Sequence, residues 1–272
     1  MAAPLTWEDQ QNQSSLPIKM EIAYDILQPN KLSFDIDQID RCINLTDRGG
    51  GLCITSSGSS LRHTNNILLT RLCVRALLSK RQGGFGSPSV IFGDAGNCSD
   101  IYQCVNFARQ YGLDIQKVLD SIIVSRPFTI HQLAGLVSNH LDSAGAAVVQ
   151  RFGAKLVVIS DLLKMFAQDS QIDPEEALWL VKEIARDIRN LSRQVVVAVS
   201  MNETCPTPQY QSLLMSLFDN QIHIAPTKIG PNKLQVKVSN NSNREHCDID
   251  GSDIQSSTFI MTEKDLKIIP PR

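Results

Sequence analysis

Apolar runs rich in β-branched residues recur along the chain and are separated by amphipathic stretches. Five such runs lie at residues 52–55, 89–92, 121–125, 154–160 and 194–200. Short continuous runs of this kind are typical of strands that are buried on both faces of a parallel sheet. Because the intervening stretches have helical periodicity, the pattern predicts an α/β fold with a mainly parallel central sheet flanked by helices.

The clearest predicted helix covers residues 173–192. Asp173 can act as its N-cap, Pro174 suits the first helical position, and Glu176 can complete a capping box. Apolar side chains then recur every three or four residues. They form one predicted buried stripe, made of Ala177, Leu180, Val181, Ile184, Ile188 and Leu191.

The two ends of the chain have different patterns. Turn clusters at 230–232 (Gly-Pro-Asn) and 250–251 (Asp-Gly) separate short strand-like runs, which predicts a C-terminal antiparallel hairpin extension of the sheet. Residues 1–19 are polar and lack periodicity, which predicts a flexible lead. No linker-like stretch interrupts residues 20–272, so we expect a single core domain there.

Composition limits the classes of partner. The net charge of -2 and the pI near 6.2 provide no general attraction to nucleic acid, so DNA binding is expected to be weak or absent. The seven cysteines never form a CxxC pair, which indicates neither a disulfide framework nor a zinc site. No secretory signal and no apolar run of roughly 20 residues is present, so we expect a cytoplasmic protein without membrane contact.

Residues 90–137 carry a family resemblance. The stretch begins VIFGDAGN and continues through ARQYGLD and VLDSI to FTIHQ. It resembles the ATPase core of the RecA/RadA recombinases, in particular archaeal RadA, and weaker similarity extends from Asp40 to the C-terminus. The resemblance implies a RecA-like P-loop NTPase fold with ATP and magnesium as the ligands. The matching residues are Arg109, Tyr111, Gly112, Leu113, Asp114, Val118, Leu119, Asp120, Arg126, Phe128, His131 and Gln132.

The loop that should bind phosphate departs from the family pattern. If Gly58 is the first glycine of GxxxxGK[ST], then His63, Thr64 and Asn65 stand at the Gly, Lys and Ser/Thr positions. A P-loop needs that lysine to reach the phosphates and that hydroxyl to bind magnesium. The alternatives are that Arg62 or His63 contacts an anion instead, or that the segment is an ordinary Ser/Asn-rich loop.

Three further positions of the implied site are replaced. Ser160 stands where the family has the Walker B aspartate, and the acid moves to Asp161, which faces the opposite way unless the strand ends there. The catalytic glutamate matches Ala95, which leaves Asp94 as the nearest acid, and Asn202 matches the glutamine that senses the γ-phosphate. Phosphoryl transfer depends on positioned charge, so these losses predict no ATP hydrolysis. The degenerate site, if it functions, comprises Gly58, Arg62, His63, Thr64, Asn65, Asp94, Ser160, Asp161 and Asn202.

The segments that match the DNA-binding loops of the family are also reduced. Residues 167–176 contain four acids and no lysine or arginine, and residues 203–208 form a short loop. Both would repel phosphate or ignore it. Residues 92–95 spell the Phe-x-x-Ala polymerisation motif, but they lie on a predicted strand, which favours a packing role.

Several other charged groups allow two interpretations. Arg71 and Arg75 lie one helical turn apart, with Lys80 and Arg81 closing the predicted helix. They could form a small basic patch, or they could simply be basic residues near a helix C-terminus. Lys228, Lys233 and Lys237 could approach a phosphate backbone, or they could protect an edge strand from aggregation.

No metal or catalytic constellation is marked by a local motif. The acids near His246 and Cys247 do not match a calcium loop, and a hairpin turn is favoured there. His131, His140 and His223 are interpreted as structural.

These observations favour a non-catalytic RadA-like paralogue with an accessory or regulatory role in DNA recombination or repair. Its expected partner is a protein, either a RadA-type recombinase or a second copy of the chain. No cofactor is assigned. One alternative is an ATP-binding or ATP-hydrolysing protein with an unusual site that uses Arg62, His63, Asp94 and Asp161. The other is a KaiC-like scaffold unrelated to DNA.

Overall fold

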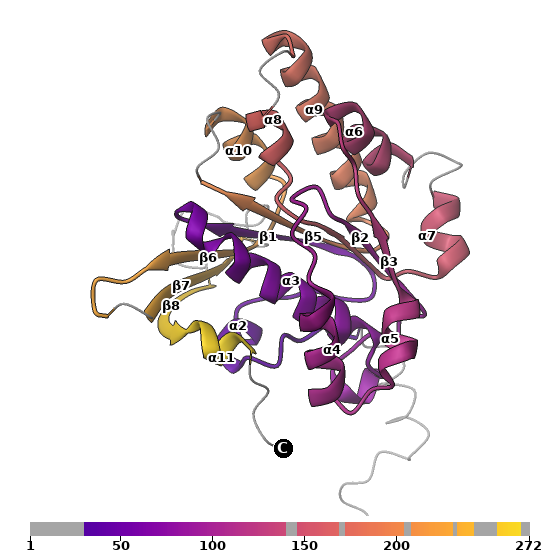
Figure 1. Cartoon of the computed structure of the whole chain (residues 1–272), viewed down its shortest axis with the longest axis vertical. Helices are drawn as coiled ribbons and strands as arrows, with labels where there is room; N and C mark the ends of the chain where they lie inside the picture. Colours follow the sequence, from indigo (N-terminus) through magenta and orange to yellow (C-terminus); the bar gives the residue numbers. More distant parts are fainter. Residues whose placement is uncertain are drawn as a thin grey trace, which may run out of the picture.

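The computed structural model describes most of the chain between residues 30 and 267 (Figure 1). The predicted flexible lead at residues 1–19 lies outside this part, as do His140, the turn at 250–251 and the acids near His246. The described ranges are 30–139, 146–168, 172–203, 208–230, 233–241 and 255–267.

The described strands form one sheet in the order β3-β2-β4-β5-β1-β6-β7-β8. Every neighbouring pair from β3 to β6 is parallel, whereas β6–β7 and β7–β8 are antiparallel. The predicted α/β class and the C-terminal antiparallel extension are therefore confirmed. The strands are β1 Gly50–Ser56, β2 Val90–Gly93, β3 Ile122–Ser125, β4 Leu156–Ile159, β5 Val196–Asn202, β6 Asn220–Pro226, β7 Lys233–Asn240 and β8 Gln255–Thr262.

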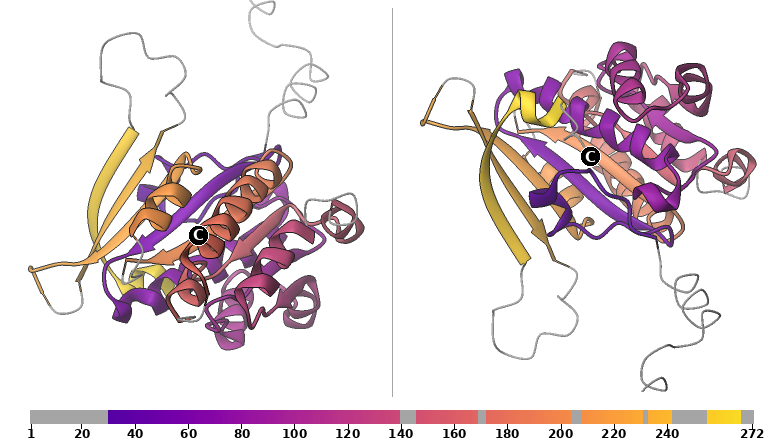
Figure 2. Two further views of the ribbon diagram at one scale, coloured as in Figure 1. Left: turned by 90° about the horizontal axis from the view of Figure 1, so that it is seen from above. Right: turned by 90° about the horizontal axis from the view of Figure 1, so that it is seen from below.

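Helices cover both faces of the parallel part of the sheet (Figures 1 and 2). Side chains alternate along β1, so Leu52 and Ile54 join one apolar cluster while Cys53 joins the other. The first cluster includes α3 Arg62–Leu77, α4 Ile101–Gln110 and α5 Ile115–Ser121, and the second includes α6 Ile130–Asn139, α8 Lys164–Gln168, α9 Pro174–Leu191 and α10 Pro208–Met215. The short elements are α2 Asp37–Asp40, η2 Ser59–Leu61, η3 Lys80–Gln82, α7 Ala146–Phe152 and α11 Glu263–Lys267.

Helix α9 begins as its sequence predicts. The Asp173 carboxylate accepts hydrogen bonds from the backbone N–H groups of Glu175 and Glu176, and Pro174 is the first helical residue. All six residues of the predicted stripe are buried. The local pattern was sufficient because both the cap and the apolar face depend on residues within the same helix.

Arg71 and Arg75 do not form an exposed basic patch, although Arg75 does lie in the last turn of α3. Both side chains are fully buried on α3. The Arg71 guanidinium donates to the backbone carbonyls of Phe34 (2.6 Å), Asp35 (2.8 Å) and Leu266 (2.9 Å). Arg75 donates to the carbonyls of residues 33 (2.8 Å) and 83 (3.1 Å). The two arginines thus satisfy loop carbonyls that would otherwise be buried without donors.

Two smaller expectations concern the sheet itself. Phe92 and Ala95 are buried, in agreement with a packing role for this Phe-x-x-Ala string. Lys233 and Lys237 do not lie on an edge strand, because β7 is paired on both sides and β8 forms that edge of the sheet.

None of the helices in the described ranges combines the length and apolar character of a membrane span.

Candidate functional site

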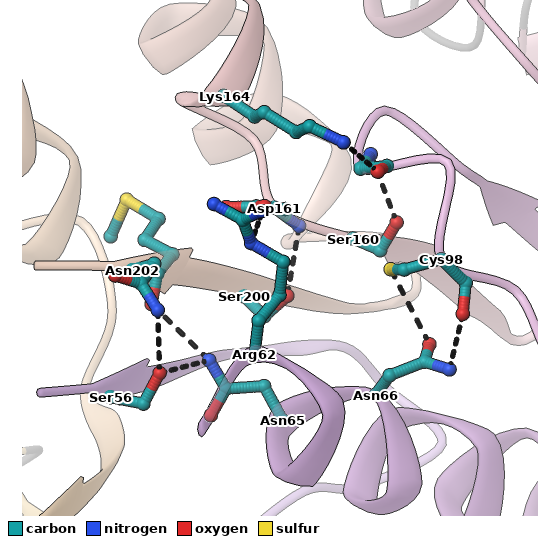
Figure 3. A network of polar contacts seen from close by, with 12 residues as sticks. Ser56, Arg62, Asn65, Asn66, Cys98, Ser160, Asp161, Lys164, Ser200 and Asn202 are labelled. Atoms are coloured by element: carbon teal, nitrogen blue, oxygen red, sulfur yellow. Dashed lines mark hydrogen bonds and ion pairs between the residues drawn. The ribbon is translucent and has the colours of Figure 1, made fainter. Parts of the chain in front are cut away.

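The candidate residues gather where the parallel strands β1, β4 and β5 end (Figure 3). Ser56 is the last residue of β1, Asn202 is the last residue of β5, and Ser160 directly follows β4. Carboxyl ends of parallel strands lie at one edge of a sheet, which is where open α/β folds bind ligands. The tertiary structure therefore brings most of the predicted site residues together.

The loop after β1 is short and closes into one 3₁₀ turn. Gly58 has a φ of 94°, in the left-handed region that favours glycine, and η2 follows it directly. The Leu61 N–H donates to the Gly58 carbonyl at 3.2 Å, and α3 then begins at Arg62. Thr64, at the position of the phosphate lysine, is buried in α3, so it cannot extend over this edge as a lysine would.

Two amides fasten this loop to the ends of the strands. Asn65 Nδ2 donates to Ser56 Oγ (2.9 Å) and to the Met201 carbonyl (3.3 Å). Asn202 Nδ2 donates to Ser56 Oγ (3.2 Å) and to the Gly58 carbonyl (2.8 Å). The residues at the magnesium-hydroxyl and γ-phosphate-sensing positions therefore bond to the protein itself.

Arg62 forms an ion pair with Asp161. Its Nε lies 2.6 Å from Asp161 Oδ2, and the two side chains are 35% and 5% exposed. Neither atom makes a hydrogen bond of good geometry within the described residues, so the contact is electrostatic. Because β4 ends at Ile159 and Asp161 adopts a φ of 48°, the displaced acid reaches this edge of the sheet despite the one-residue shift.

The charge state of Asp161 reflects opposing effects. Burial raises the pKa of this carboxyl above its ordinary value, while the positive charges of Arg62 and Lys164 act in the opposite direction. The Lys164 ammonium also donates to the Gly96 carbonyl. The cation nearest to the buried Asp161 carboxylate is thus the Arg62 guanidinium of the protein itself.

Asp94 is fully buried and its carboxylate is occupied by internal donors. Oδ1 accepts from Ser160 Oγ (3.0 Å) and the Cys98 N–H (2.8 Å), and Oδ2 accepts from the Ser99 N–H (3.2 Å). Arg126 Nη2 also donates to Oδ2 at 2.9 Å. Burial alone would raise the pKa of Asp94, but the hydrogen bonds hold it below its ordinary value. This acid therefore serves as an anchor for the loop after β2.

His63 points away from the other candidate residues. Its Nε2 lies 3.8 Å from Glu263 Oε1 of α11, and both side chains are about half exposed. Neither Ser160 nor Asp161 contacts it in the described structure. The predicted set is thus split, with His63 outside the network of Figure 3.

Several members of this network were not among the residues that the sequence marked as a site. Asn66 donates to the Cys98 carbonyl at 2.6 Å, and Lys164 and Arg126 make the contacts given above. Burial raises the pKa of the Cys98 thiol to about 11, so this cysteine is a poor nucleophile at neutral pH. Their partners are at least 32 residues away along the chain, so no local pattern marked them.

The Rad51 family model matches residues 38–216, which include β1 to β5 and the network just described. The chain belongs to the Rad51 family. This confirms the resemblance to the RecA/RadA core. No curated protein matches the chain.

Rad51-family membership implies that ATP and magnesium bind at this edge of the sheet. The residues present lack the groups with which the family binds phosphate and magnesium. Thr64 is buried where a lysine would reach phosphate, and Arg62 already neutralises Asp161. Asn65 Oδ1 is a buried oxygen without a hydrogen-bond partner, but magnesium requires several oxygen ligands in near-octahedral geometry. Within the described ranges, no three His, Cys, Asp or Glu side chains are grouped to hold a metal ion.

Proposed function

We propose that this Rad51-family protein does not hydrolyse ATP and acts as an accessory or regulatory protein in DNA recombination or repair. The observation that carries the proposal is the 2.6 Å ion pair between Arg62 and Asp161. In this family the corresponding region must hold phosphates and a divalent cation. Here an arginine from the P-loop position neutralises the acid next to the Walker B position.

The electrostatics support this proposal. A guanidinium in contact with a carboxylate that is only 5% exposed opposes the arrival of a second cation at the same oxygen. Asp94, the only other acid assigned to the site, already accepts hydrogen bonds from four residues. Hydrolysis needs a free acid to orient water and a cation to stabilise the transferring phosphoryl group.

A protein partner, either a RadA-type recombinase or a second copy, is part of the same proposal. Strand β3 is an edge of the sheet, and Val124 on it is 51% exposed. Phe128, just after this strand, is 79% exposed, and Tyr102 at the start of α4 is 78% exposed. Open strand edges and large exposed apolar side chains favour contact with another protein.

The first test is an equilibrium titration of the purified protein with a fluorescent ATP analogue and magnesium, competed with unlabelled ATP. The expected result is no saturable binding and no release of phosphate. Saturable binding that ATP displaces at micromolar concentration would overturn the proposed loss of nucleotide function. The fluorophore without nucleotide is the control for non-specific binding.

A second experiment addresses the partner. Light scattering measures whether the protein self-associates, and co-purification with a RadA-type recombinase measures the hetero-complex. Replacing Phe128 with Ser should weaken whichever complex forms, while replacing Lys117, an exposed residue of α5, with Ser should not. A complex that tolerates Phe128→Ser would contradict the role given to this edge.

A further inference from the structure

A serine, a histidine and a glutamate meet beside the network of Figure 3. Ser57 directly follows β1, Glu203 directly follows β5, and His223 lies on β6. Strand β1 pairs in parallel with both β5 and β6, and Thr55 of β1 is the register partner of His223. Three adjacent strands, β5, β1 and β6, therefore bring these side chains together near the carboxyl ends of β1 and β5.

The contacts between these side chains are within hydrogen-bonding range. Ser57 Oγ lies 3.2 Å from His223 Nε2 and donates to Glu203 Oε2 at 2.5 Å. Glu203 Oε1 lies 3.5 Å from His223 Nδ1. A nucleophile, an imidazole base and a carboxylate in mutual contact are the components of nucleophilic hydrolysis.

Thr55 is placed to hydrogen-bond the other nitrogen of the His223 ring. Its Oγ1 lies 2.9 Å from His223 Nδ1 and donates its own proton to the Ile222 carbonyl at 3.5 Å. The proposed reaction needs the tautomer in which Nδ1 donates to the Thr55 hydroxyl. This leaves the lone pair of Nε2 directed toward Ser57.

We propose that Ser57, His223 and Glu203 form a site that hydrolyses carboxylic esters. The Ser57 hydroxyl first turns its proton from Glu203 Oε2 to His223 Nε2. Ser57 Oγ then attacks the carbonyl carbon as that proton moves to Nε2, and the ester C–O bond breaks as the proton passes to the departing alcohol. Water then attacks the acyl-serine and gives its proton to Nε2, and the carboxylic acid leaves as Ser57 regains its proton. Thr55 holds the imidazole through Nδ1, and Glu203 stabilises its charged form across the 3.5 Å contact.

The surroundings suit this chemistry. The side chains of His223 and Glu203 are 33% and 41% exposed, so a substrate can reach them from solvent. Ser57 lies in a strand–turn–helix connection, with Gly58 at a φ of 94° and the positive end of α3 just beyond. A sharp strand-to-helix turn exposes a nucleophilic serine, and a helix N-terminus favours the developing oxyanion.

Lys237 indicates the class of ester. It lies directly opposite His223 in the antiparallel β6–β7 pair, and it is exposed. Residues directly opposite each other in such a pair project from the same face. A cation at this position favours an ester that carries a negatively charged group, such as a dicarboxylic acid monoester.

Covalent labelling with a fluorophosphonate probe tests the site without any nucleotide, so its result is independent of the ATP titration. The expected result is one labelled residue, Ser57, identified by mass spectrometry. Ser57→Ala should abolish labelling, and His223→Asn should slow it about 100-fold. Ser59→Ala and Ser60→Ala change neighbouring serines of η2 and should label like the parent protein, with circular dichroism confirming that every variant is folded.

The roles of Glu203 and Lys237 are tested by the turnover of a p-nitrophenyl monoester of succinate, compared with the turnover of p-nitrophenyl acetate. Glu203→Gln should lower kcat at unchanged KM, and Lys237→Ala should remove the preference for the succinate ester. Labelling that persists in folded Ser57→Ala, or the absence of labelling and turnover in the parent protein, would overturn the proposal.

Discussion

The two halves of helix α3 use buried or partly buried arginine in different ways. At its start, Arg62 is 35% exposed and contacts one carboxylate, that of Asp161. Further along, Arg71 is fully buried and donates to three backbone carbonyls from distant segments. The first contact joins two charged side chains where β1 and β4 end. The second contact joins α3 to the segments that contain Phe34, Asp35 and Leu266.

This difference shows that the charge of an arginine does not reveal its role. The Arg71 guanidinium also lies 4.0 Å from the Asp35 carboxylate and 5.8 Å from the centroid of the Phe107 ring. Arg75 likewise lies 5.1 Å from the Tyr111 centroid. These contacts are built into the core, whereas the Arg62 pair lies at the surface of the sheet edge.

The largest effect is expected from Arg71→Ala. The change leaves the carbonyls of Phe34, Asp35 and Leu266 without their donor and opens a cavity beside α3. The free energy of unfolding should fall by about 3–5 kcal/mol. Urea denaturation measures it, with the exposed Lys80→Ala as the matched control. A loss below about 1 kcal/mol would show that Arg71 does not hold these segments.

Asp94→Asn should have the next largest effect. The amide keeps the shape but loses the charge that pairs with Arg126 and accepts from Ser160, so the loss should be about 2–3 kcal/mol at neutral pH. Because the pKa of Asp94 is lowered in the folded protein, its stabilisation is present above the ordinary value of 3.8 and is lost as the pH falls through the lower folded value. The difference from the parent protein should therefore narrow below pH 3.8, and a constant difference would contradict this explanation.

Arg62→Ala should cost less, about 1 kcal/mol at neutral pH, because the arginine is partly exposed. The pKa of Asp161 is raised by burial, so this carboxyl favours the folded state at low pH and loses that contribution as the pH rises through its folded pKa. Removing Arg62 should raise that pKa further, so the variant should approach the parent protein in stability at low pH. In a double-mutant cycle with Asp161→Ala, the two losses should be less than additive.

The smallest effect is expected from His63→Ala. Its contact with Glu263 spans 3.8 Å between two half-exposed side chains. Such surface pairs contribute little, so the change in unfolding free energy should stay within about 0.5 kcal/mol. A clearly larger loss in the same urea experiment would mean that α11 depends on this contact.

Local sequence patterns were sufficient to predict much of the fold. Strands β1 to β5, the cap and stripe of α9, and the antiparallel C-terminal strands follow from periodicity, capping residues and turns that act over a few neighbouring positions. The family resemblance also came from one continuous stretch of the chain.

Only the tertiary structure decided which polar groups meet. Ser57 and His223 are separated by 166 positions along the chain, and they touch because β1 and β6 are neighbours in one register. The burial of Arg71 and Arg75 likewise required the loops that supply their carbonyl partners. A periodic pattern reports which face of an element is apolar, but contacts between distant charges depend on strand order and register, which that pattern does not contain.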